Sequence, residues 1–442
     1  MLKRFLLLVI VLSCLTRGEA ENSSFAIASV PQTLSAKAPE VFPENPDFIE
    51  DRKVYDQNTD KVLEVFVTVF EKPGATLGDV ESDVDPFAKT GHSVEVLFQE
   101  GDFGKGVASA NATLRIRGHS SRDTEQKSFQ IKLLDKQQPW RNHRLISLNK
   151  HPFDLTRVRN KLSFDLFKSL PHMGSLRTQF IHLTVKKNAK DPGKDYGLFT
   201  QVENLDEVNL ASHGLDPAGL LYFPEEFLFE RYPDTLQRTT EPGYKKEDFK
   251  KVLGWYGNSD HSKLLAMLDD VNNEAMDINQ VMKKHFNVNN YLTWLAMNVL
   301  LENRDTINQN FTLYCPSKGN CWYFLPWDYD GALGFTSQPD QKGVASLHLR
   351  WFQGVANWWD SILHKRFLKC PGNVAALKAK IEELKTTIFT QEKIKSLLAG
   401  YHYTVKSYVS RSPDLENLGI AFPEAGKTVA SSNPLSDFDE EY

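Results

Sequence analysis

Residues 303–331 read NRDTINQNFTLYCPSKGNCWYFLPWDYDG. Two runs rich in aromatic and β-branched residues, 311–315 and 321–327, flank the polar turn PSKGN, which predicts a β-hairpin. In the segment ahead of them, the apolar residues from Leu292 to Leu300 follow helical spacing. The expected local order is therefore a helix, a polar loop, a strand, a turn and a second strand.

Three polar residues lie at the ends of this predicted hairpin. Asp305 and Asn310 stand five positions apart ahead of the first strand, and Asp328 follows the second strand. A hairpin that leaves Asn310 and returns to Asp328 would bring both side chains to the same end of a sheet. A protein-kinase active site needs such a set: one Asp faces the substrate hydroxyl, while an Asn and a second Asp hold the metal ions on the nucleotide phosphates. The alternative is an acidic loop whose carboxylates cap backbone groups or are solvated.

Each of these groups has an expected role. Asp305 orients the attacking hydroxyl or accepts its proton, as the Asp of H-R-D-x-x-x-x-N does in ordinary kinases. Asn310 and Asp328 supply hard oxygen ligands that suit Mg or Mn. Asp330 lies two residues beyond Asp328, so in a continuing strand it shares a face with Asp328 and helps to bind metal. Otherwise Asp330 is an exposed turn carboxylate before Gly331. The implied cofactors are ATP and Mg or Mn.

Candidate nucleotide-binding residues lie earlier in the chain. Lys127 and Lys132 fall on one predicted strand but on opposite faces. The triplet Gln-Ile-Lys that ends at Lys132 resembles the V-A-I-K strand of kinases, which favours Lys132 as the phosphate ligand. The alternative is a solvated lysine on an edge strand. Gly118 and Ser120 could let backbone amides approach a phosphate, or could form a simple polar turn.

The roles of two arginines and one glutamate stay open at this point. Arg117 and Arg159 could hold phosphates, or could pair structurally with Asp165. Glu203 follows a predicted strand at the place where the hinge of a kinase meets adenine. The backbone of Glu203 could matter there more than its carboxylate.

The N-terminus resembles a targeting segment. Two basic residues precede the apolar run 5–12, and small residues follow at a cleavage site, so residues 1–20 are predicted to be a signal peptide that is cleaved after Ala20. Eight apolar residues are too few to span a bilayer. In a competing interpretation, Cys14 is the lipidated residue of a bacterial lipoprotein. In both cases the protein leaves the cytoplasm, for the medium, the cell envelope or the periplasm.

Charge and composition exclude some classes of protein. The chain has 442 residues, of which 41% are hydrophobic and 25% charged, a composition typical of globular proteins. Residues 1–20 carry three basic residues and one acidic residue, so their removal changes the formal net charge from −5 to −7. General nucleic-acid binding requires a basic surface, so nucleic acid is not an expected partner. No segment after the N-terminus is a candidate for an integral membrane span.

Cys315 and Cys321 flank the predicted turn. In an oxidising compartment they could form a disulfide across the hairpin. Cross-strand disulfides require demanding geometry, so two reduced core cysteines are the alternative.

Periodicity divides the rest of the chain into two regions. Strands are expected at 62–70, 93–99, 112–117, 127–133, 180–185 and 196–202, and helices at 155–170, 373–387 and 390–403. Residues 206–300 are expected to be mostly helical or irregular. The predicted organisation is a mobile leader (21–55), a β-rich N-lobe (56–205), a C-lobe that carries the active site (206–410) and a loose acidic tail (411–442).

Together these motifs resemble the CotH (spore coat protein H) kinase family over roughly residues 60–410. The pieces are RGHSS at 117–121, where the family commonly has R-G-N-S-[ST], KSFQIKL at 127–133, RNKL at 159–162, YGLF at 196–199 followed by Glu203, and the block 303–334. His119 departs from the usual Asn. The resemblance implies an α+β, two-lobed atypical protein-kinase-like fold, with a β-rich N-lobe and a mostly helical C-lobe. Members of the family phosphorylate extracytoplasmic or coat proteins on Ser/Thr, and some relatives act in surface adhesion.

Three functions are compatible with these motifs. The first is an exported kinase that transfers the γ-phosphate of ATP to Ser/Thr of surface or secreted proteins. The second is a non-catalytic surface or adhesion protein that uses the kinase fold for binding. The third is nucleotidyl transfer to protein. The presence of Asp305, Asn310 and Asp328 favours the first.

Overall fold

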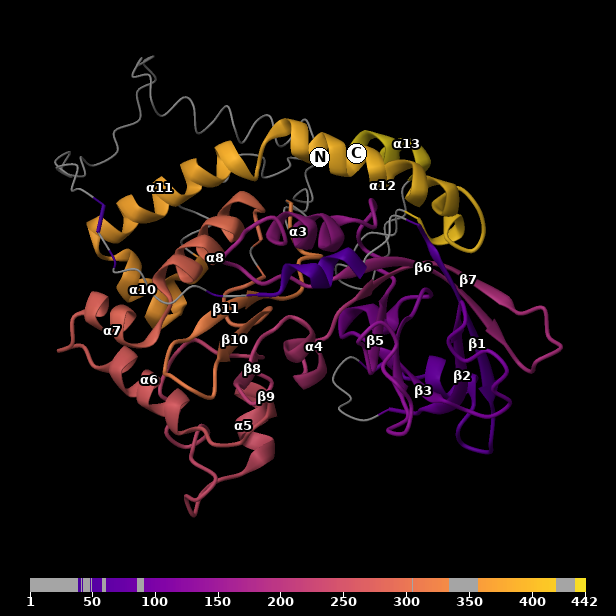
Figure 1. Cartoon of the computed structure of the whole chain (residues 1–442), viewed down its shortest axis with the longest axis horizontal. Coiled ribbons are helices and arrows are strands. Elements are labelled where there is room, and N and C mark those ends of the chain that lie inside the picture. The colour runs from indigo at the N-terminus through magenta and orange to yellow at the C-terminus, as the bar shows by residue number, and fades with distance from the viewer. Residues whose placement is uncertain are drawn as a thin grey trace.

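The chain folds into two lobes joined by a central helix (Figure 1). The computed structural model describes residues 39–40, 42, 48, 50–57, 61–85, 91–303, 305–333, 357–418 and 434–442. The predicted signal peptide, Cys14 and most of the predicted leader lie outside the described residues. Within the part of the chain that is described, no helix is both long and apolar enough to cross a lipid bilayer.

The N-lobe is a closed seven-stranded barrel. Its strands are β1 (Leu63–Phe70), β2 (Val94–Glu100), β3 (Ala112–Arg117), β4 (Ser128–Leu133), β5 (Leu145–Asn149), β6 (Thr178–Lys186) and β7 (Lys194–Val202). They follow one another in the order β1-β2-β3-β4-β5-β7-β6, and the parallel pairing of β1 with β6 closes the barrel. Alternate side chains such as Val65, Val67 and Val69 fill the interior. The predicted strands are confirmed, and β5 is an additional strand that periodicity did not reveal.

The C-lobe is built around a small sheet with strand order β11-β10-β8-β9. Its strands are β8 (Leu220–Pro224), β9 (Leu253–Gly257), β10 (Phe311–Cys315) and β11 (Tyr323–Pro326). Strands β10 and β11 pair antiparallel, which confirms the predicted hairpin. The prediction for residues 206–300 missed β8 and β9. A five-residue apolar run such as LLYFP cannot be told from a piece of buried helix by periodicity alone.

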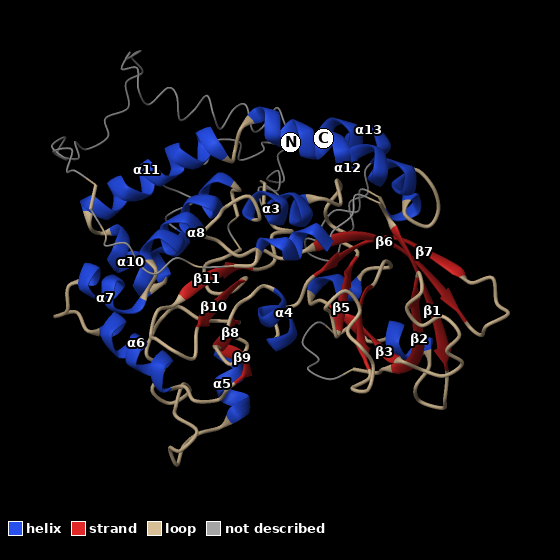
Figure 2. Cartoon of the chain, in the orientation of Figure 1, coloured by secondary structure: helices blue, strands red, loops and turns tan. Residues whose placement is uncertain are grey.

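Helices surround this sheet and make the C-lobe mostly helical (Figure 2). They are α4 (Glu207–Ser212), α5 (Lys246–Val252), α6 (Ser262–Asn272), α7 (Ile278–His285), α8 (Val288–Leu300), α10 (Ile362–Leu368), α11 (Pro371–Thr387) and α12 (Gln391–Val409). Helix α8 is nearly all buried, between β11 and α11. Helix α12 contacts β7 of the barrel, so the helices α11 and α12 together extend over both lobes (Figure 1). The predicted helices in this region are confirmed.

Helix α3 (Arg159–Phe167) lies between the lobes (Figure 1). All nine of its residues are buried, including the charged ones. It confirms the helix predicted over 155–170, although residues 155–158 and 168–170 lie outside the helix. Smaller elements complete the chain: η2 (Arg52–Gln57), α2 (Leu77–Glu81), η3 (Ser120–Asp123), η4 (Asn357–Asp360), η5 (Leu415–Asn417) and α13 (Pro434–Glu441).

Two predicted boundaries are wrong. The predicted mobile leader includes residues 50–55, yet Glu50 is buried and η2 packs Val54 into the body. The predicted loose tail includes α13, in which Phe438 is buried and Asp439 pairs with Lys406 of α12 at 2.7 Å. Asp414 also belongs to the folded body. Composition and the lack of periodicity indicated a mobile leader, and acidity indicated a loose tail, but a few side chains in each segment find partners elsewhere in the fold.

The hairpin cysteines do not form the proposed disulfide. Cys315 and Cys321 are free thiols, and Cys315 is buried beside the turn carbonyls of Pro316 and Gly319. Burial raises the pKa of Cys315 to about 12, so this thiol is an inert part of the core.

Candidate active site

Asp305 and Asn310, which the five-residue spacing predicted to belong to one site, are in direct contact. Asp305 lies in the loop that follows α8, and its Oδ2 accepts a hydrogen bond of 2.7 Å from Nδ2 of Asn310. Its Oδ1 accepts a hydrogen bond of 2.8 Å from Nε2 of Gln309. Because the amide nitrogen of Asn310 is engaged with Asp305, its Oδ1 remains the atom that can bind a metal. Burial raises the pKa of Asp305, and the charge of Asp330 raises it further.

Asn310 and Asp328 lie at the same end of the β10–β11 hairpin. The register pairs Phe311 with Pro326, so Asn310 precedes one strand where the other strand ends. Both residues have left-handed backbone angles, with φ of 57° at Asn310 and 50° at Asp328. Asn and Asp tolerate this region better than other non-glycine residues. The hairpin therefore turns both side chains out of the strand direction at the point where the two segments meet.

Asp330 and Gly331 complete the cluster. The backbone N–H of Leu333 donates to the carbonyl of Leu301 at 2.6 Å, which ties the segment after β11 to the loop after α8. A Cβ added to Gly331 would lie 3.5 Å from Cβ of Asp305, so the two segments are in van der Waals contact there. The three aspartates of the predicted site are thereby brought together from two loops.

The electrostatics of Asp328 reflect this crowding. Burial raises its pKa to about 8, assisted by the charges of Asp330 and Asp305 and by a side-chain hydrogen bond with Asp330, while Arg117 opposes the shift. Like-charged carboxylates in one site disfavour the ionised state of one another. A divalent cation among them would offset this repulsion.

Asn160 of α3 holds the Asp328 segment from the other lobe. Its Oδ1 accepts the backbone N–H of Tyr329 at 3.0 Å, and its Nδ2 lies 3.5 Å from Oδ1 of Asp328. Tyr329 is fully buried against Phe164 and Phe167 of the same helix, with ring centroids 5.9 and 5.1 Å away. Asn160 stood in the RNKL motif, but the sequence assigned it no role.

Arg117 is a predicted phosphate ligand whose charge interacts with those of the aspartates. It is the last residue of β3. Burial lowers the pKa of Arg117, and the negative charges of Asp328 and Asp330 partly offset this shift. Gly118, next in the chain, has a φ of 94°, and an added Cβ would lie 2.1 Å from Oγ of Ser121. Only glycine fits this turn, which contains Ser120 at the start of η3.

The two candidate lysines lie elsewhere. Lys132 is the exposed position of β4, whose other five side chains are buried, so it lies on the outer surface of the barrel. Lys127 donates from Nζ to the carbonyl of Arg122 at 2.7 Å. Within the described residues, no hydrogen bond or ion pair joins either lysine to the three aspartates. Arg159 pairs with Asp154, while among the described residues Asp165 pairs with Lys161 and Lys168, which corrects the structural alternative raised for Arg159.

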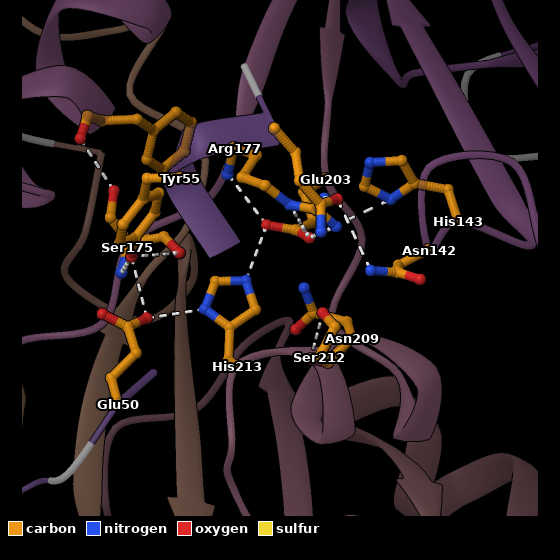
Figure 3. Close-up of polar contacts among 12 residues, drawn as sticks. Glu50, Tyr55, Asn142, His143, Ser175, Arg177, Glu203, Asn209, Ser212 and His213 are labelled. Atoms are coloured by element: carbon orange, nitrogen blue, oxygen red, sulfur yellow. Dashed lines mark hydrogen bonds and ion pairs between the residues drawn. The ribbon is translucent and has the colours of Figure 1, made fainter. Parts of the chain in front are cut away.

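Glu203 lies in a separate buried network between the lobes (Figure 3). Arg177 binds its carboxylate through Nε and Nη2, and Nε2 of His213 lies 3.0 Å from its Oε2. The other ring nitrogen of His213 lies 2.6 Å from Oε1 of Glu50, and Tyr55 also donates to Oε1 at 2.8 Å. The carboxylate of Glu203 is thus engaged in ion pairs that join the N-terminal segment, β7 and α4.

The protonation of this network follows from its geometry. Both ring nitrogens of His213 face carboxylates, so both donate and the ring is an imidazolium. Burial would lower the pKa of His213, but Glu203 and Glu50 raise it to about 9. Burial alone would raise the pKa of Glu203, but His213 and Arg177 hold it well below its usual range. The sequence offered no signal for this cluster, because its members lie far apart in the chain.

The donor set of the aspartate cluster fits Mg or Mn. It consists of one amide oxygen and carboxylate oxygens, the ligands that these hard cations prefer. Among the described residues, no three His, Cys, Asp or Glu side chains converge as a preformed metal centre. Such a site therefore relies on Asn310 and on oxygen atoms from water, or from a phosphate ligand when one is bound, to complete each coordination shell.

Comparisons with known proteins show the family of this chain. The model of the CotH kinase protein family matches residues 114–421, and the chain belongs to this family. The chain is 26% identical over 309 residues to the inner spore coat protein H of Bacillus subtilis (strain 168), covering 69% of this chain and 79% of that protein. The proinflammatory kinase CtkA of Helicobacter pylori aligns at 12% identity over 61% of this chain and 94% of its own, with a TM-score of 0.25 that is too low to bear on the fold. The protein is therefore kinase-like, with an α+β fold.

Proposed function

We propose that this protein transfers the γ-phosphoryl group of ATP to Ser/Thr hydroxyls of proteins outside the cytoplasm. The observation that carries the proposal is the contact of Asp305 with Asn310 beside Asp328 and Asp330. A phosphotransferase needs a carboxylate for the hydroxyl and oxygen ligands for the cation in one place. When bound, the cation would bridge phosphate oxygens and neutralise the charge that develops on them.

Each residue then has a defined task. Asp305 faces the substrate hydroxyl and accepts or orients its proton, a role favoured by its raised pKa. Asn310 and Asp328 hold the cation through oxygen, and Asp330 supports Asp328. Arg117 reaches the site from the barrel and supplies a fixed positive charge for the phosphates. The cluster is thus assembled from both lobes, as ATP bound between them requires.

Radiolabel transfer tests this proposal. The chain from residue 21 onward is incubated with Mg or Mn, casein as an acidic acceptor protein, and ATP labelled at either the γ or the α phosphate. Label from the γ position alone on Ser or Thr supports a kinase. Retention of the α label on protein would instead indicate nucleotidyl transfer. Metal-dependent ATP binding without any transfer would favour the non-catalytic binding protein.

Location outside the cytoplasm is a separate part of the proposal. It rests on the N-terminal sequence. Mass spectrometry of the N-terminus of the exported protein tests it. A first residue of Glu21 indicates cleavage after Ala20, whereas a lipid-modified Cys14 indicates a lipoprotein. An intact N-terminus on protein recovered only from the cytoplasm would contradict export.

A further inference from the structure

His151 is a buried residue beside the aspartate cluster to which the sequence assigned no role. It follows β5 in the loop that leads to α3, and only 3% of its side chain surface is exposed. Its backbone is left-handed, with φ of 49°, although it is neither Gly nor Asn and precedes Pro152. Backbone strain of this kind persists only where the surrounding structure holds it, and it concentrates at functional sites.

Buried hydrogen bonds hold this strained loop in place. Nη1 of Arg157 donates to the carbonyl of His151 at 2.6 Å and to the carbonyl of Lys150 at 2.9 Å. Nη2 of Arg157 donates to Oε1 of Gln126 of the barrel lobe at 2.9 Å. Because Arg157 is itself buried, its hydrogen bonds fix the position of the His151 ring relative to the barrel.

The ring of His151 faces the cluster with one nitrogen. Its Nδ1 lies 3.8 Å from Oδ2 of Asp330. Its Nε2 is buried and has no hydrogen-bond partner among the described residues. The ring proton therefore belongs on Nδ1, where an acceptor is in reach. At 3.8 Å the contact is longer than a hydrogen bond, so a small rotation of Asp330 is needed to form one.

The side chain of Asp330 thus has two possible hydrogen-bond partners, Asp328 and His151. Its side chain now shares a hydrogen bond with Asp328, and Nδ1 of His151 lies on another side of it. While Asp330 is bonded to Asp328, it occupies an oxygen of Asp328 that a cation needs. Turning toward His151 would free Asp328.

We propose that His151 is a positioning residue whose Nδ1–H donates a hydrogen bond to Asp330 when the site holds its cation, which leaves the oxygens of Asp328 free to bind that cation. The proposal rests on the proposed function only in assigning a cation to Asp328. Removing a group that hydrogen-bonds a metal ligand and orients it lowers the affinity for the metal about 10- to 100-fold. His151 would act in this way without touching the cation.

Two substitutions at this position separate positioning from packing. Gly and Asn both tolerate the left-handed backbone, so neither adds strain. His151→Asn keeps an N–H donor close to the place of Nδ1–H, whereas His151→Gly removes the donor. Melting temperatures of both variants report any loss of packing. If His151→Gly fails to fold, His151→Asn is compared with His151→Asp, which tolerates the same backbone but lacks the donor.

The decisive measurement is binding of Mn²⁺ alone, followed by the electron paramagnetic resonance signal of the free ion. We expect His151→Gly to weaken Mn²⁺ binding about 10- to 100-fold and His151→Asn to restore most of it. In the background of Asp330→Asn, the His151→Gly change should add little, because the two residues act through one contact. Equal Mn²⁺ affinity of wild type and His151→Gly would overturn the proposal, as would full additivity with Asp330→Asn.

The readout separates this inference from the proposed function. It uses neither nucleotide nor acceptor protein, so it holds whether or not phosphoryl transfer occurs. A protein that binds Mn²⁺ with this pattern of variants but transfers no phosphate keeps the role of His151 and loses the kinase assignment. A wild type that binds no Mn²⁺, alone or with ATP, overturns both.

Discussion

Oδ2 of Asp305 accepts a hydrogen bond of 2.7 Å from Nδ2 of Asn310, so the residue proposed to face the hydroxyl and the residue proposed to hold the metal position each other. In this arrangement Asn310 presents only its Oδ1 to a cation. The hydrogen bond also fixes the carboxylate plane of Asp305 before any substrate arrives. Preorganisation of this kind avoids reorganisation of the catalytic group during the reaction.

Asp305→Ala should abolish phosphoryl transfer and leave ATP binding largely intact, because Asp305 acts on the hydroxyl and not on the nucleotide. Loss of a general base or orienting carboxylate costs about 10²- to 10⁴-fold in rate. Transfer assays and calorimetric titration of ATP on the same preparation measure both quantities. Asp102→Ala is the matched control, since 94% of the side chain surface of Asp102 is exposed. Collapse of ATP affinity in a folded Asp305→Ala variant would show that the role is wrongly assigned.

Asp328→Ala should remove both activity and metal-dependent ATP binding, whereas Asp330→Ala should keep part of each. A ligand held through its phosphates loses most of its affinity when the bridging cation has no anchor, because the charge of the phosphates is then uncompensated. Calorimetric titration of ATP with and without Mg or Mn separates the two variants. Equal binding by wild type and Asp328→Ala in the presence of metal would remove Asp328 from the site.

Asn160→Ala should destabilise the protein as well as the site. The change leaves the buried backbone N–H of Tyr329 without its acceptor, at a cost of about 1–3 kcal/mol. Urea denaturation measures the free energy of unfolding, and Lys132→Ala on the exposed face of β4 is the control with little expected change. An Asn160→Ala variant as stable as wild type would mean that a water molecule or a shifted backbone satisfies Tyr329.

Stability should fall as the pH rises through about 9, because of His213. Its pKa in the folded state lies above its ordinary value, so the stabilisation is fully present below pH 6.5 and is lost as the pH passes about 9. The groups around it are Glu50, Glu203, Arg177 and His143. The shift corresponds to a contribution of about 3 kcal/mol at most.

Thermal unfolding between pH 6 and pH 10 measures this effect. His213→Gln should lower the melting temperature near pH 7 and flatten its decline between pH 7 and pH 10. Glu50→Gln, which removes one of the two carboxylates, should shift the decline to lower pH and serves if His213→Gln does not fold. Parallel curves for wild type and both variants would exclude His213 as the titrating group.

Much of the site could be predicted from one continuous segment. Asp305, Asn310 and Asp328 stand at positions where a helix, a loop and a hairpin follow each other, and strand pairing of neighbours along the chain brings the ends of the hairpin together. Period-2 patterns likewise predicted most strands of the barrel. The predictions failed for β5, β8 and β9, whose five residues each are too short for a period to be read and which no predicted hairpin turn marked, as one marked β10 and β11.

The sequence by itself determined the hairpin with its three polar residues, the run of strands before it and the helices after it, because each of these depends on spacing between near neighbours. Only the tertiary structure decided which distant groups surround them. Arg117 and His151 reach the aspartates from the barrel lobe, and Glu50 and Glu203 meet across His213. These contacts join residues that lie from 10 to more than 160 positions apart, and no local pattern encodes them. They form because packing of the two lobes buries charged groups, and a buried charge must find a partner.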